Sequence, residues 1–456
     1  MTQMRTGTVV DPVGIAGGML RSAQHDSARD GRSGGTRSCG ALRRPGPGVS
    51  GARVAYPAGM ETRWQGRPVW AEIDVDALEH NVRTLAARAA PSRLCAVVKA
   101  NAYGHGAVAV ASAAVEAGAA AVGVVCADEG EELRLAGFDA PVLVLGAASV
   151  AEAEKMVDLR LTPVVGSMQL ALALSRFAAD RGVAQPVHLE LESGLNRHGL
   201  DADALVAFAE SVRALPGIEV EGLFTHFAAA EEGDTGFTHA QYEALTEVAR
   251  RLDWIPVRHC AATASLLQSP DMRLDMVRAG LGIYGYHPAP GCGDDIDLRP
   301  VLTLKSRIAR VSEVEAGATV GYGRTWTAGR RSKIALVMCG YADGLRRALS
   351  NKAQLLVRGR RAPVAGRIAM DMCMLDVTDV PGVAPDDEVV IIGAQGGERV
   401  SADELAELAD TISWEILAGI GARVPRLYLR GGAISGVTTL NERIPWPLPE
   451  PAAEAT

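Results

Sequence analysis

The chain has 456 residues, of which 48% are hydrophobic, and a formal net charge of −8 at pH 7. It is longer than a single hydrophobic core usually grows, so we expect two domains. The acidic balance provides no basic field for a phosphate backbone, which disfavours nucleic acid as a partner. No apolar run approaches the roughly 20 residues of a membrane-spanning helix, and no signal-peptide pattern is present.

The seven cysteines are scattered without any C-x-x-C spacing, and the nine histidines show no paired ligand spacing. Neither a disulfide framework nor a metal site is therefore indicated. Unpaired cysteines are typical of a reducing compartment, so we expect a cytoplasmic protein that binds no metal.

Residues 1–60 are rich in Gly, Ser and Arg and have almost no periodic apolar pattern. Such a composition buries too little surface to offset the entropy of ordering, so we expect this segment to be disordered. It bears arginines and few acids, as targeting peptides do, but its Gly and Pro content argues against an amphipathic helix. Another interpretation is that translation begins at Met60.

Beyond an extended segment at 69–74, short apolar runs alternate with alanine-rich segments of helical period. The runs are continuous, as in strands buried on both faces, and predict strands at 94–98, 121–126, 142–145, 161–165, 187–192, 222–226, 257–261 and 276–280. The predicted helices include 107–117, 129–136, 151–158, 168–181, 202–215 and 239–252. Roughly eight strand-helix units predict an α/β fold with a closed (β/α)8 barrel of the TIM type over 75–298. An open doubly wound sheet is less favoured, because no G-x-G-x-x-G turn follows an early strand.

From residue 299, alternating and β-branched runs replace most helices. They predict strands at 301–311, 333–338, 354–357, 370–377, 388–393 and 426–429. One helix, 402–409, is expected behind Ser401 as its N-cap, with Glu404 three residues on. We therefore expect a mainly antiparallel β domain formed by 61–74 and 299–445. The tail at 446–456 is rich in Pro and acidic residues and is expected to be flexible.

Lys99 directly follows the apolar run Leu94-Cys-Ala-Val-Val, at the end of the first predicted barrel strand. Reactive residues of a barrel stand at these strand ends. Apolar surroundings lower the pKa of a lysine and suit Schiff-base chemistry. Position alone favours a lysine that extends to the barrel rim, so the neighbouring residues must decide.

Those residues form the run Lys99-Ala-Asn-Ala-Tyr-Gly-His-Gly, which closely resembles the cofactor-lysine motif of the alanine racemases. The resemblance implies a pyridoxal 5'-phosphate enzyme in which Lys99 holds the cofactor and Tyr103 contacts its phosphate. Basic amino-acid decarboxylases and single-domain cofactor-carrier proteins have a similar lysine strand, so this motif alone does not define the reaction. The resemblance extends from about Trp70 to Arg426.

A second motif is Asp275-Met-Val-Arg-Ala-Gly-Leu-Gly-Ile-Tyr-Gly. By resemblance, Arg278 faces the pyridine nitrogen, and the backbone amides of Gly280 and Leu281 bind the phosphate. Amides at a strand-to-helix turn bind anions, and Gly280 permits a close approach; taken alone, the glycines also fit an ordinary turn. An arginine at the ring nitrogen disfavours protonation there and limits side reactions.

Racemisation requires a base on each face of a planar carbanion, and Lys99 serves one face. The segment Val320-Gly-Tyr-Gly-Arg-Thr-Trp resembles the family motif that supplies the second base from the partner subunit, here Tyr322. A tyrosine with a pKa near 10 needs cationic neighbours or a proton shuttle at neutral pH. By resemblance His226 and Arg278 provide that network and His259 supports Arg278, although each histidine also fits an ordinary hydrogen-bonded barrel residue.

Two further segments resemble parts of the family's pocket. Gly366-Arg-Ile-Ala-Met-Asp implies that the Met370 backbone binds the substrate carboxylate, with Asp371 beside it. Gly340-Tyr-Ala-Asp-Gly-Leu-Arg-Arg implies an entrance lined by Tyr341 and Arg347. Since Tyr322 and Met370 would be donated across an interface, the resemblance implies an obligate homodimer.

The chain departs from the family pattern at several pocket positions. Arg197, expected at the cofactor and the substrate carboxylate, follows Glu190, where many members have a carbamylated lysine; we hypothesise that Glu190 pairs with Arg197 in its place. Where the family usually has Asn-Ser the chain has Ala262-Thr263, and Thr263 keeps a hydroxyl donor for the phosphate. Where the family has a phosphate-binding tyrosine the chain has Trp414, which offers a single N–H from a bulkier ring.

The resemblance therefore implies an alanine racemase that interconverts L- and D-alanine by a Lys99/Tyr322 two-base mechanism and supplies D-alanine for peptidoglycan. The altered phosphate pocket keeps a serine or broad-specificity racemase open. A non-catalytic cofactor-binding protein is disfavoured by the retained β domain with Tyr322 and Met370.

Overall fold

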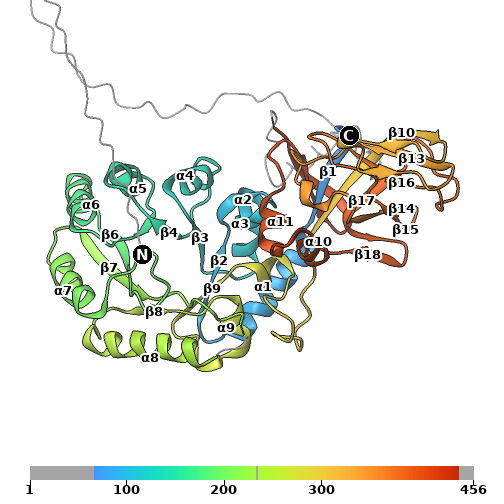
Figure 1. Ribbon diagram of the computed structural model, residues 1–456. Helices are drawn as coiled ribbons and strands as arrows, with labels where there is room; N and C mark the ends of the chain where they lie inside the picture. The colour runs from blue at the N-terminus through green and yellow to red at the C-terminus, as the bar shows by residue number, and fades with distance from the viewer. Residues whose placement is uncertain (1–65, 233–234, 441–456) are drawn as a thin grey trace, which may run out of the picture. The chain divides into compact units, whose positions relative to one another are not determined.

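The computed structural model describes residues 66–232 and 235–440 (Figure 1). The chain separates into two units, 1–60 and 61–456, and the first lies outside the described residues. The expectations for 1–60 and for 446–456 therefore concern residues outside the described part.

Eight parallel strands form a barrel in the order β8-β7-β6-β5-β4-β3-β2-β9. The first and last strands of this order are joined by backbone hydrogen bonds from Asp275 N to Arg258 O and from Arg278 N to Ala261 O, both of 3.0 Å. The strands are β2 (Arg93–Val97), β3 (Ala121–Val124), β4 (Val142–Ala147), β5 (Thr162–Val164), β6 (Gln185–Glu190), β7 (Ile218–Phe224), β8 (Val257–His259) and β9 (Met276–Ala279). The predicted barrel is confirmed.

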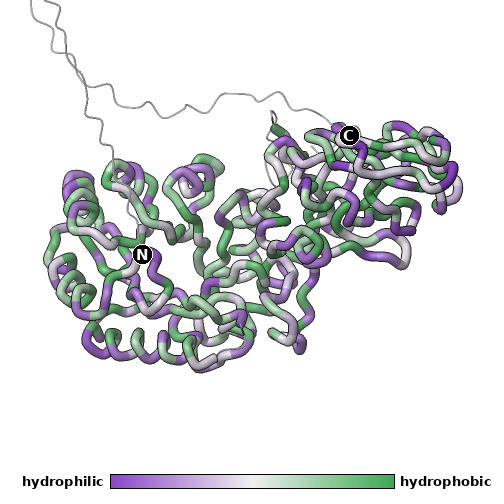
Figure 2. The backbone as a smooth tube through the Cα atoms, viewed as in Figure 1, coloured by the Kyte–Doolittle hydropathy of each residue, from purple (hydrophilic) through white to green (hydrophobic). Residues whose placement is uncertain are grey.

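Helices surround the barrel strands (Figure 1). They are α1 (Val75–Ala89), α3 (Ala107–Glu116), α4 (Ala127–Leu135), α5 (Ala153–Asp158), α6 (Met168–Arg181), α7 (Ala202–Arg213), α8 (Thr235–Arg251) and α9 (Thr263–Gln268). Local signals fix their ends: the Ser167 side chain accepts from Leu170 N at the start of α6, and Gly182 ends it at φ +65°. Figure 2 shows hydrophilic residues recurring between hydrophobic ones along α8, as expected of helices with one face on a core.

The second half of the chain forms a ten-stranded, mainly antiparallel sheet with the path β15-β14-β17-β10-β1-β19-β20. Strands β13 and β16 extend it from β10, and β18 pairs with β17. Its members are β1 (Val69–Asp74), β10 (Leu302–Val314), β13 (Ser332–Val337), β14 (Gln354–Val357), β15 (Arg360–Pro363), β16 (Cys373–Asp376), β17 (Glu388–Gln395), β18 (Glu398–Val400), β19 (Arg426–Arg430) and β20 (Ala433–Thr438). A two-stranded ribbon, β11 (Thr319–Val320) with β12 (Trp326–Thr327), stands apart.

Strand β1 precedes the barrel in sequence but lies inside this sheet, antiparallel to β10 and parallel to β19. Its side chains are mostly buried, with Val69, Ala71 and Ile73 at 0% exposure. The expected helix at 402–409 is α10 (Ala402–Ala409), and Glu404 N donates to Ser401 Oγ at 3.0 Å. A short helix that the sequence did not predict, α11 (Ser413–Ala418), follows it.

Two predicted elements are corrected. The strand predicted at 370–377 begins only at Cys373, because residues 370–372 form a loop that lines a cavity. The helix predicted at 151–158 is divided: a 3-10 turn at Val150–Glu152, held by the Ser149 and Glu152 capping box, precedes α5.

Candidate active site

A cavity of about 590 Å³ opens at the C-terminal ends of the barrel strands. Lys99 reaches it just after β2, His226 after β7, and Arg278 from β9. All nine residues predicted to bind a cofactor line this one cavity: Lys99, Tyr103, Arg197, His226, Thr263, Arg278, Gly280, Leu281 and Trp414.

A left-handed turn sets the directions of Lys99 and Tyr103. Ala100, Asn101, Ala102 and Tyr103 have φ values of 54°, 53°, 53° and 50°. This conformation costs about 1–2 kcal/mol for each residue that has a Cβ atom, so the surrounding structure must compensate for it. The sequence contains no glycine among these four residues to indicate such a turn.

The ammonium group of Lys99 lies in surroundings that favour its neutral form. Burial, and next the nearby positive charge of Arg197, lower the pKa of Lys99, while the negative charge of Glu129 partly opposes both. A lysine with a lowered pKa is a better nucleophile and base at neutral pH.

Hydroxyl and backbone N–H groups gather at one end of the cavity. Burial raises the pKa of Tyr103 to about 12, so its hydroxyl stays a hydrogen-bond donor. Thr263 Oγ1 accepts from Gly280 N at 3.1 Å and from Gly282 N at 3.3 Å. Leu281 begins a 3-10 helix, where backbone N–H groups lack acceptors within the helix. The hydroxyls of Tyr103 and Thr263 and the N–H of Leu281 suit an anion such as a phosphate group.

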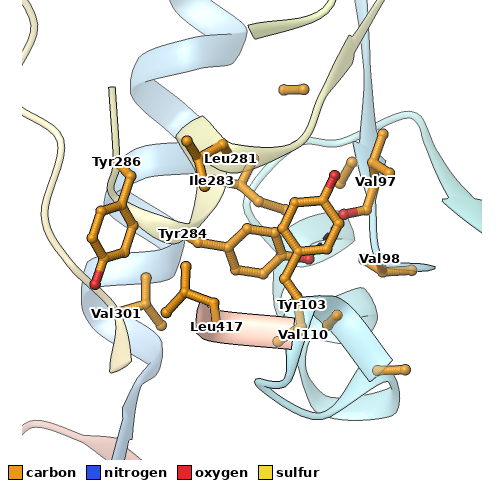
Figure 3. Close-up of a cluster of buried hydrophobic side chains, with 14 of the residues drawn as sticks. Val97, Val98, Tyr103, Val110, Leu281, Ile283, Tyr284, Tyr286, Val301 and Leu417 are labelled. Carbon is orange, nitrogen blue, oxygen red and sulfur yellow. Dashed lines mark hydrogen bonds between the residues drawn. The ribbon is translucent and has the colours of Figure 1, made fainter. Parts of the chain in front are cut away.

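A side chain at Gly280 would crowd the Tyr103 hydroxyl. A Cβ atom at Gly280 would lie 2.8 Å from the Tyr103 hydroxyl oxygen, which is closer than packing allows. Figure 3 shows the Tyr103 ring against that of Tyr284, with Val97 and Leu281 nearby; the ring centroids are 4.8 Å apart. Tyr284 is anchored by a 2.8 Å hydrogen bond to Val97 O. The cavity thus combines the Lys99 amine with a group of anion-binding donors, and this combination fits a cofactor that has a phosphate and a reactive carbonyl carbon.

Arg278 is the central cation of the cavity and is 3% exposed. Its Nη2 donates to His226 Nδ1 at 3.0 Å and to Thr225 O at 3.0 Å, and its Nη1 contacts His259 Nδ1 at 2.5 Å. Burial, and next the charge of Arg278, lower the pKa of His226 to about 3. His226 is therefore neutral, and the positive charge resides on Arg278.

A buried chain continues from Arg278 through two histidines. His259 Nε2 lies 2.9 Å from His188 Nδ1, and His188 Nε2 lies 3.5 Å from Glu221 Oε2. Because Arg278 donates to His259 Nδ1, the proton of neutral His259 is on Nε2 and is directed to His188. The sequence analysis missed His188 and Glu221. The sequence did hold a signal for His188: it lies two residues before Glu190 on β6, and side chains two residues apart on a strand share one face.

Glu190 is buried, with 5% exposure, at the end of β6. Its Oε1 lies 3.5 Å from Arg197 Nη2, and its Oε2 lies 2.5 Å from His198 Nδ1. The His198 contact is not aligned as a hydrogen bond, so Oε2 has no hydrogen-bond partner in the described part of the chain. Burial raises the pKa of Glu190, and Arg197 opposes that shift. The geometry brings Glu190 and Arg197 together, and it adds His198, which the sequence analysis did not single out.

The residues predicted to act across an interface or to line the entrance lie around a different cavity of the same chain. They are Tyr322, Met370, Asp371, Tyr341 and Arg347. Three of these side chains are unusually exposed for their type: Tyr322 at 74%, Met370 at 53% and Tyr341 at 41%. Clustered exposed apolar side chains are typical of an interaction surface.

A buried carboxylate orders the Met370 loop. Asp343 is 0% exposed and lies 2.9 Å from Arg423 Nε, and Arg423 Nη2 lies 2.7 Å from Asp371. The Met370 carbonyl accepts from Ala342 N at 3.0 Å. These contacts fix the orientation of the peptide that follows Ala369.

Within residues 66–232 and 235–440, no group of three or more His, Cys, Asp or Glu side chains is arranged to hold a metal ion. In the same ranges, none of the helices has the length and apolar character needed to cross a membrane.

Comparison with known proteins gives one consistent result. Family models of the alanine racemase N-terminal and C-terminal domains match residues 73–288 and 301–428. Alanine racemases of Halothermothrix orenii and Symbiobacterium thermophilum are 43% and 46% identical over 368 and 366 residues, each covering 79% of this chain and 97% of the relative. The solved alanine racemase of Clostridium difficile 630 has a TM-score of 0.78 and 33% identity, covering 82% of this chain and 98% of that one.

Proposed function

Since the chain belongs to the alanine racemase family and is an isomerase, we propose that it interconverts L- and D-alanine with pyridoxal 5'-phosphate, supplying D-alanine for peptidoglycan. The observation that carries the proposal is the convergence of Lys99, Tyr103, Arg278 and the Gly280 turn on one cavity. A lowered lysine pKa beside a cluster of anion-binding donors is the chemistry that this cofactor requires.

We assign the cofactor contacts to this chain's own residues. Lys99 would hold the cofactor covalently, and Tyr103, Thr263 and the amide of Leu281 would bind its phosphate. The Gly280 amide, expected from the sequence to bind the phosphate as well, donates to Thr263 Oγ1 at 3.1 Å and would orient that hydroxyl. Arg278 would face the ring nitrogen and keep it unprotonated. When bound, pyridoxal phosphate withdraws electrons from the α-carbon of the joined amino acid and makes the α-proton acidic.

Two bases would act on opposite faces of that carbon. Lys99 would remove or return the proton on one face, and Tyr322 of a second copy would do so on the other. Support for a second copy is that Tyr322 and Met370 are exposed and line a cavity separate from that of Lys99. We therefore propose a homodimer with two sites.

Neutral His226 would connect Tyr322 to the charge of Arg278. Its Nδ1 accepts from Arg278, so its proton is on Nε2, from which it would hydrogen-bond the tyrosine oxygen. Arg278 would thus stabilise the phenolate without giving up its own proton.

The substrate carboxylate would be bound by Arg197 and by the Met370 backbone of the second copy, with Tyr341 and Arg347 at the entrance. Glu190 would orient Arg197, whose guanidinium lies 3.5 Å from it. A carboxylate oxygen beside Arg197 fixes the orientation of its guanidinium group through a charge-assisted contact.

The test uses the purified full chain with pyridoxal phosphate and L-alanine in deuterium oxide. We expect D-alanine carrying an α-deuteron, and no product with Lys99→Arg, which keeps the charge but not the nucleophilic amine. If L-serine is turned over faster than L-alanine, serine and not alanine is the preferred substrate. Carbon dioxide release, or no α-proton exchange with any amino acid, would refute the racemase.

The two-copy site has its own test. Lys99→Ala and Tyr322→Ala each remove one base and should each be inactive. If the sites are shared, mixing the two inactive proteins and allowing the subunits to exchange restores activity, because a hybrid pairs an intact Lys99 with an intact Tyr322. No recovery after demonstrated exchange would mean that each chain forms its own site.

A further inference from the structure

The left-handed turn Ala100–Tyr103 follows directly on Lys99 and ends at Tyr103, and both of these residues are proposed to contact the cofactor. Four consecutive residues with Cβ atoms do not hold this conformation unaided. Persistent strain of this kind requires contacts that determine the backbone from outside.

At the start of the turn, the carboxylate of Glu129 in α4 binds two backbone amides. Its Oε1 accepts from Ala100 N at 2.7 Å, and its Oε2 accepts from Val125 N at 2.8 Å. One side chain therefore joins the first strained residue to the segment that follows β3. Hydrogen bonds to a charged acceptor are stronger than neutral ones.

At the end of the turn, the guanidinium of Arg426 in β19 binds four carbonyls. Its Nε donates to Gly104 O at 3.0 Å, Nη1 to Gly421 O at 2.8 Å and Val424 O at 2.6 Å, and Nη2 to Ile420 O at 2.9 Å. Arg426 is 2% exposed. It therefore joins the exit of the turn to the segment after α11.

The backbone just after the turn is closely packed against other elements. Gly104 has φ +83°, and a Cβ atom there would lie 2.3 Å from Leu417 O of α11. Gly106 has φ +103°, and a Cβ atom there would lie 1.9 Å from the Tyr428 hydroxyl of β19. The turn is thus pressed against the elements that Arg426 also holds.

We propose that Glu129 and Arg426 are positioning residues that hold the left-handed turn, so that Lys99 and Tyr103 face the same cavity. Neither side chain is among those that line the cavity. Both bind backbone atoms of residues 100–104, and the charge of Glu129 in addition partly opposes the lowering of the Lys99 pKa; recovery of binding with Ala100→Gly separates the backbone contact from this charge effect. The inference rests on the proposed function, because its readout is the binding of pyridoxal phosphate.

The first test compares Arg426→Lys with Arg134→Lys. Arg134 is a matched control because it also binds four carbonyls, those of Leu159, Phe138, Ala140 and Arg160, and does not line the cavity. Cofactor affinity is measured by absorbance titration of the cofactor-free full chain, well below the melting temperature of each variant. We expect Arg426→Lys to weaken binding by about tenfold or more and to shift the absorbance of the bound cofactor, and Arg134→Lys to do neither.

A second pair applies if Arg426→Lys fails to fold. Glu129→Gln removes the charge from the first contact, and Glu152→Gln does so at an amide contact outside the cavity lining, where Glu152 Oε2 accepts from Ser149 N at 2.8 Å. We expect only Glu129→Gln to weaken cofactor binding. Adding Ala100→Gly should restore part of the loss, because glycine adopts the left-handed conformation without strain.

Equal affinities for each variant and its control, or no recovery with Ala100→Gly, would overturn the inference. A wild-type chain that binds no pyridoxal phosphate would instead refute the proposed function. The two failures are therefore distinguishable.

Discussion

Arg278 Nη2 donates to His226 Nδ1 across 3.0 Å, and this contact determines where the proton of His226 resides. Burial and the charge of Arg278 lower the pKa of His226 to about 3, so the ring is neutral and its proton is on Nε2. In the proposed mechanism that proton faces the catalytic tyrosine. The positive charge is thus on Arg278, and the group that donates a hydrogen bond to the tyrosine is the neutral His226.

The stability of the protein should report this neutral histidine. Between pH 6.5 and about 3, the unfolded chain binds a proton at His226 that the folded chain does not, so the free energy of unfolding falls as the pH falls through this window. We expect His226→Asn to flatten the fall measured by urea unfolding at pH 7 and pH 5. Equal slopes for His226→Asn and the wild type would contradict the assignment.

Tyr322→Phe should stop racemisation without affecting folding. The side chain is 74% exposed, so we expect an unchanged melting temperature and a loss of activity of about 10²–10⁴-fold, as for removal of a catalytic base. One enantiomer should still exchange its α-proton through Lys99. Tyr341→Phe, in the same cavity, is the control and should keep exchange from both enantiomers. Equal loss of exchange from both enantiomers in Tyr322→Phe would argue against a base on each face.

Glu190→Gln should separate stability from activity. Burial raises the pKa of Glu190 above its usual 4.5, so above pH 4.5 the unfolded chain releases this proton more readily than the folded chain. Stability contributed by the protonated carboxyl is therefore lost as the pH rises through the raised pKa. We expect the stability of Glu190→Gln relative to the wild type to increase from pH 4.5 to 7, while the KM for alanine rises.

Glu192→Gln gives the opposite sign and is the matched control. Burial would raise the pKa of Glu192, but backbone N–H groups, including those of Gly194 at 2.6 Å and Arg197 at 3.0 Å, hold it below its usual value. Its contribution is present above pH 4.5 and is lost as the pH falls below 4.5, so the variant should be less stable than the wild type by a nearly constant amount from pH 4.5 to 7, and that difference should shrink at lower pH. The same trend in both variants would refute the role of burial at Glu190.

Trp414→Tyr should improve cofactor binding. Trp414 lines the cavity but offers one N–H donor, whereas a tyrosine hydroxyl both donates and accepts. We expect the affinity for pyridoxal phosphate to rise about threefold to tenfold, in line with one added hydrogen bond. Trp414→Phe removes the bulk without adding a hydroxyl; if Phe and Tyr bind the cofactor equally, the hydroxyl is not the cause.

The sequence predicts the barrel because each strand is a continuous apolar run and the segments between them have apolar residues at helical spacing. It predicts much of the cavity lining because Lys99 and Arg278 each belong to a local motif at the end of a predicted strand. Helix α1 was missed, although Asp74 accepts from Ala77 N as an N-cap. The turn at 100–103 was missed because its conformation is imposed by Glu129 and Arg426, and contacts between residues so distant in sequence leave no local pattern.

The position of β1 has a consequence for synthesis of the protein. Its partners are β10 and β19, with Val69 opposite Ser306 and Ala71 opposite Arg426. Strand β1 leaves the ribosome before the barrel but cannot complete its pairing until nearly the whole chain has been made. During that interval the apolar strand β1 lacks both of its partners, so chaperones that shield such edges should matter most then.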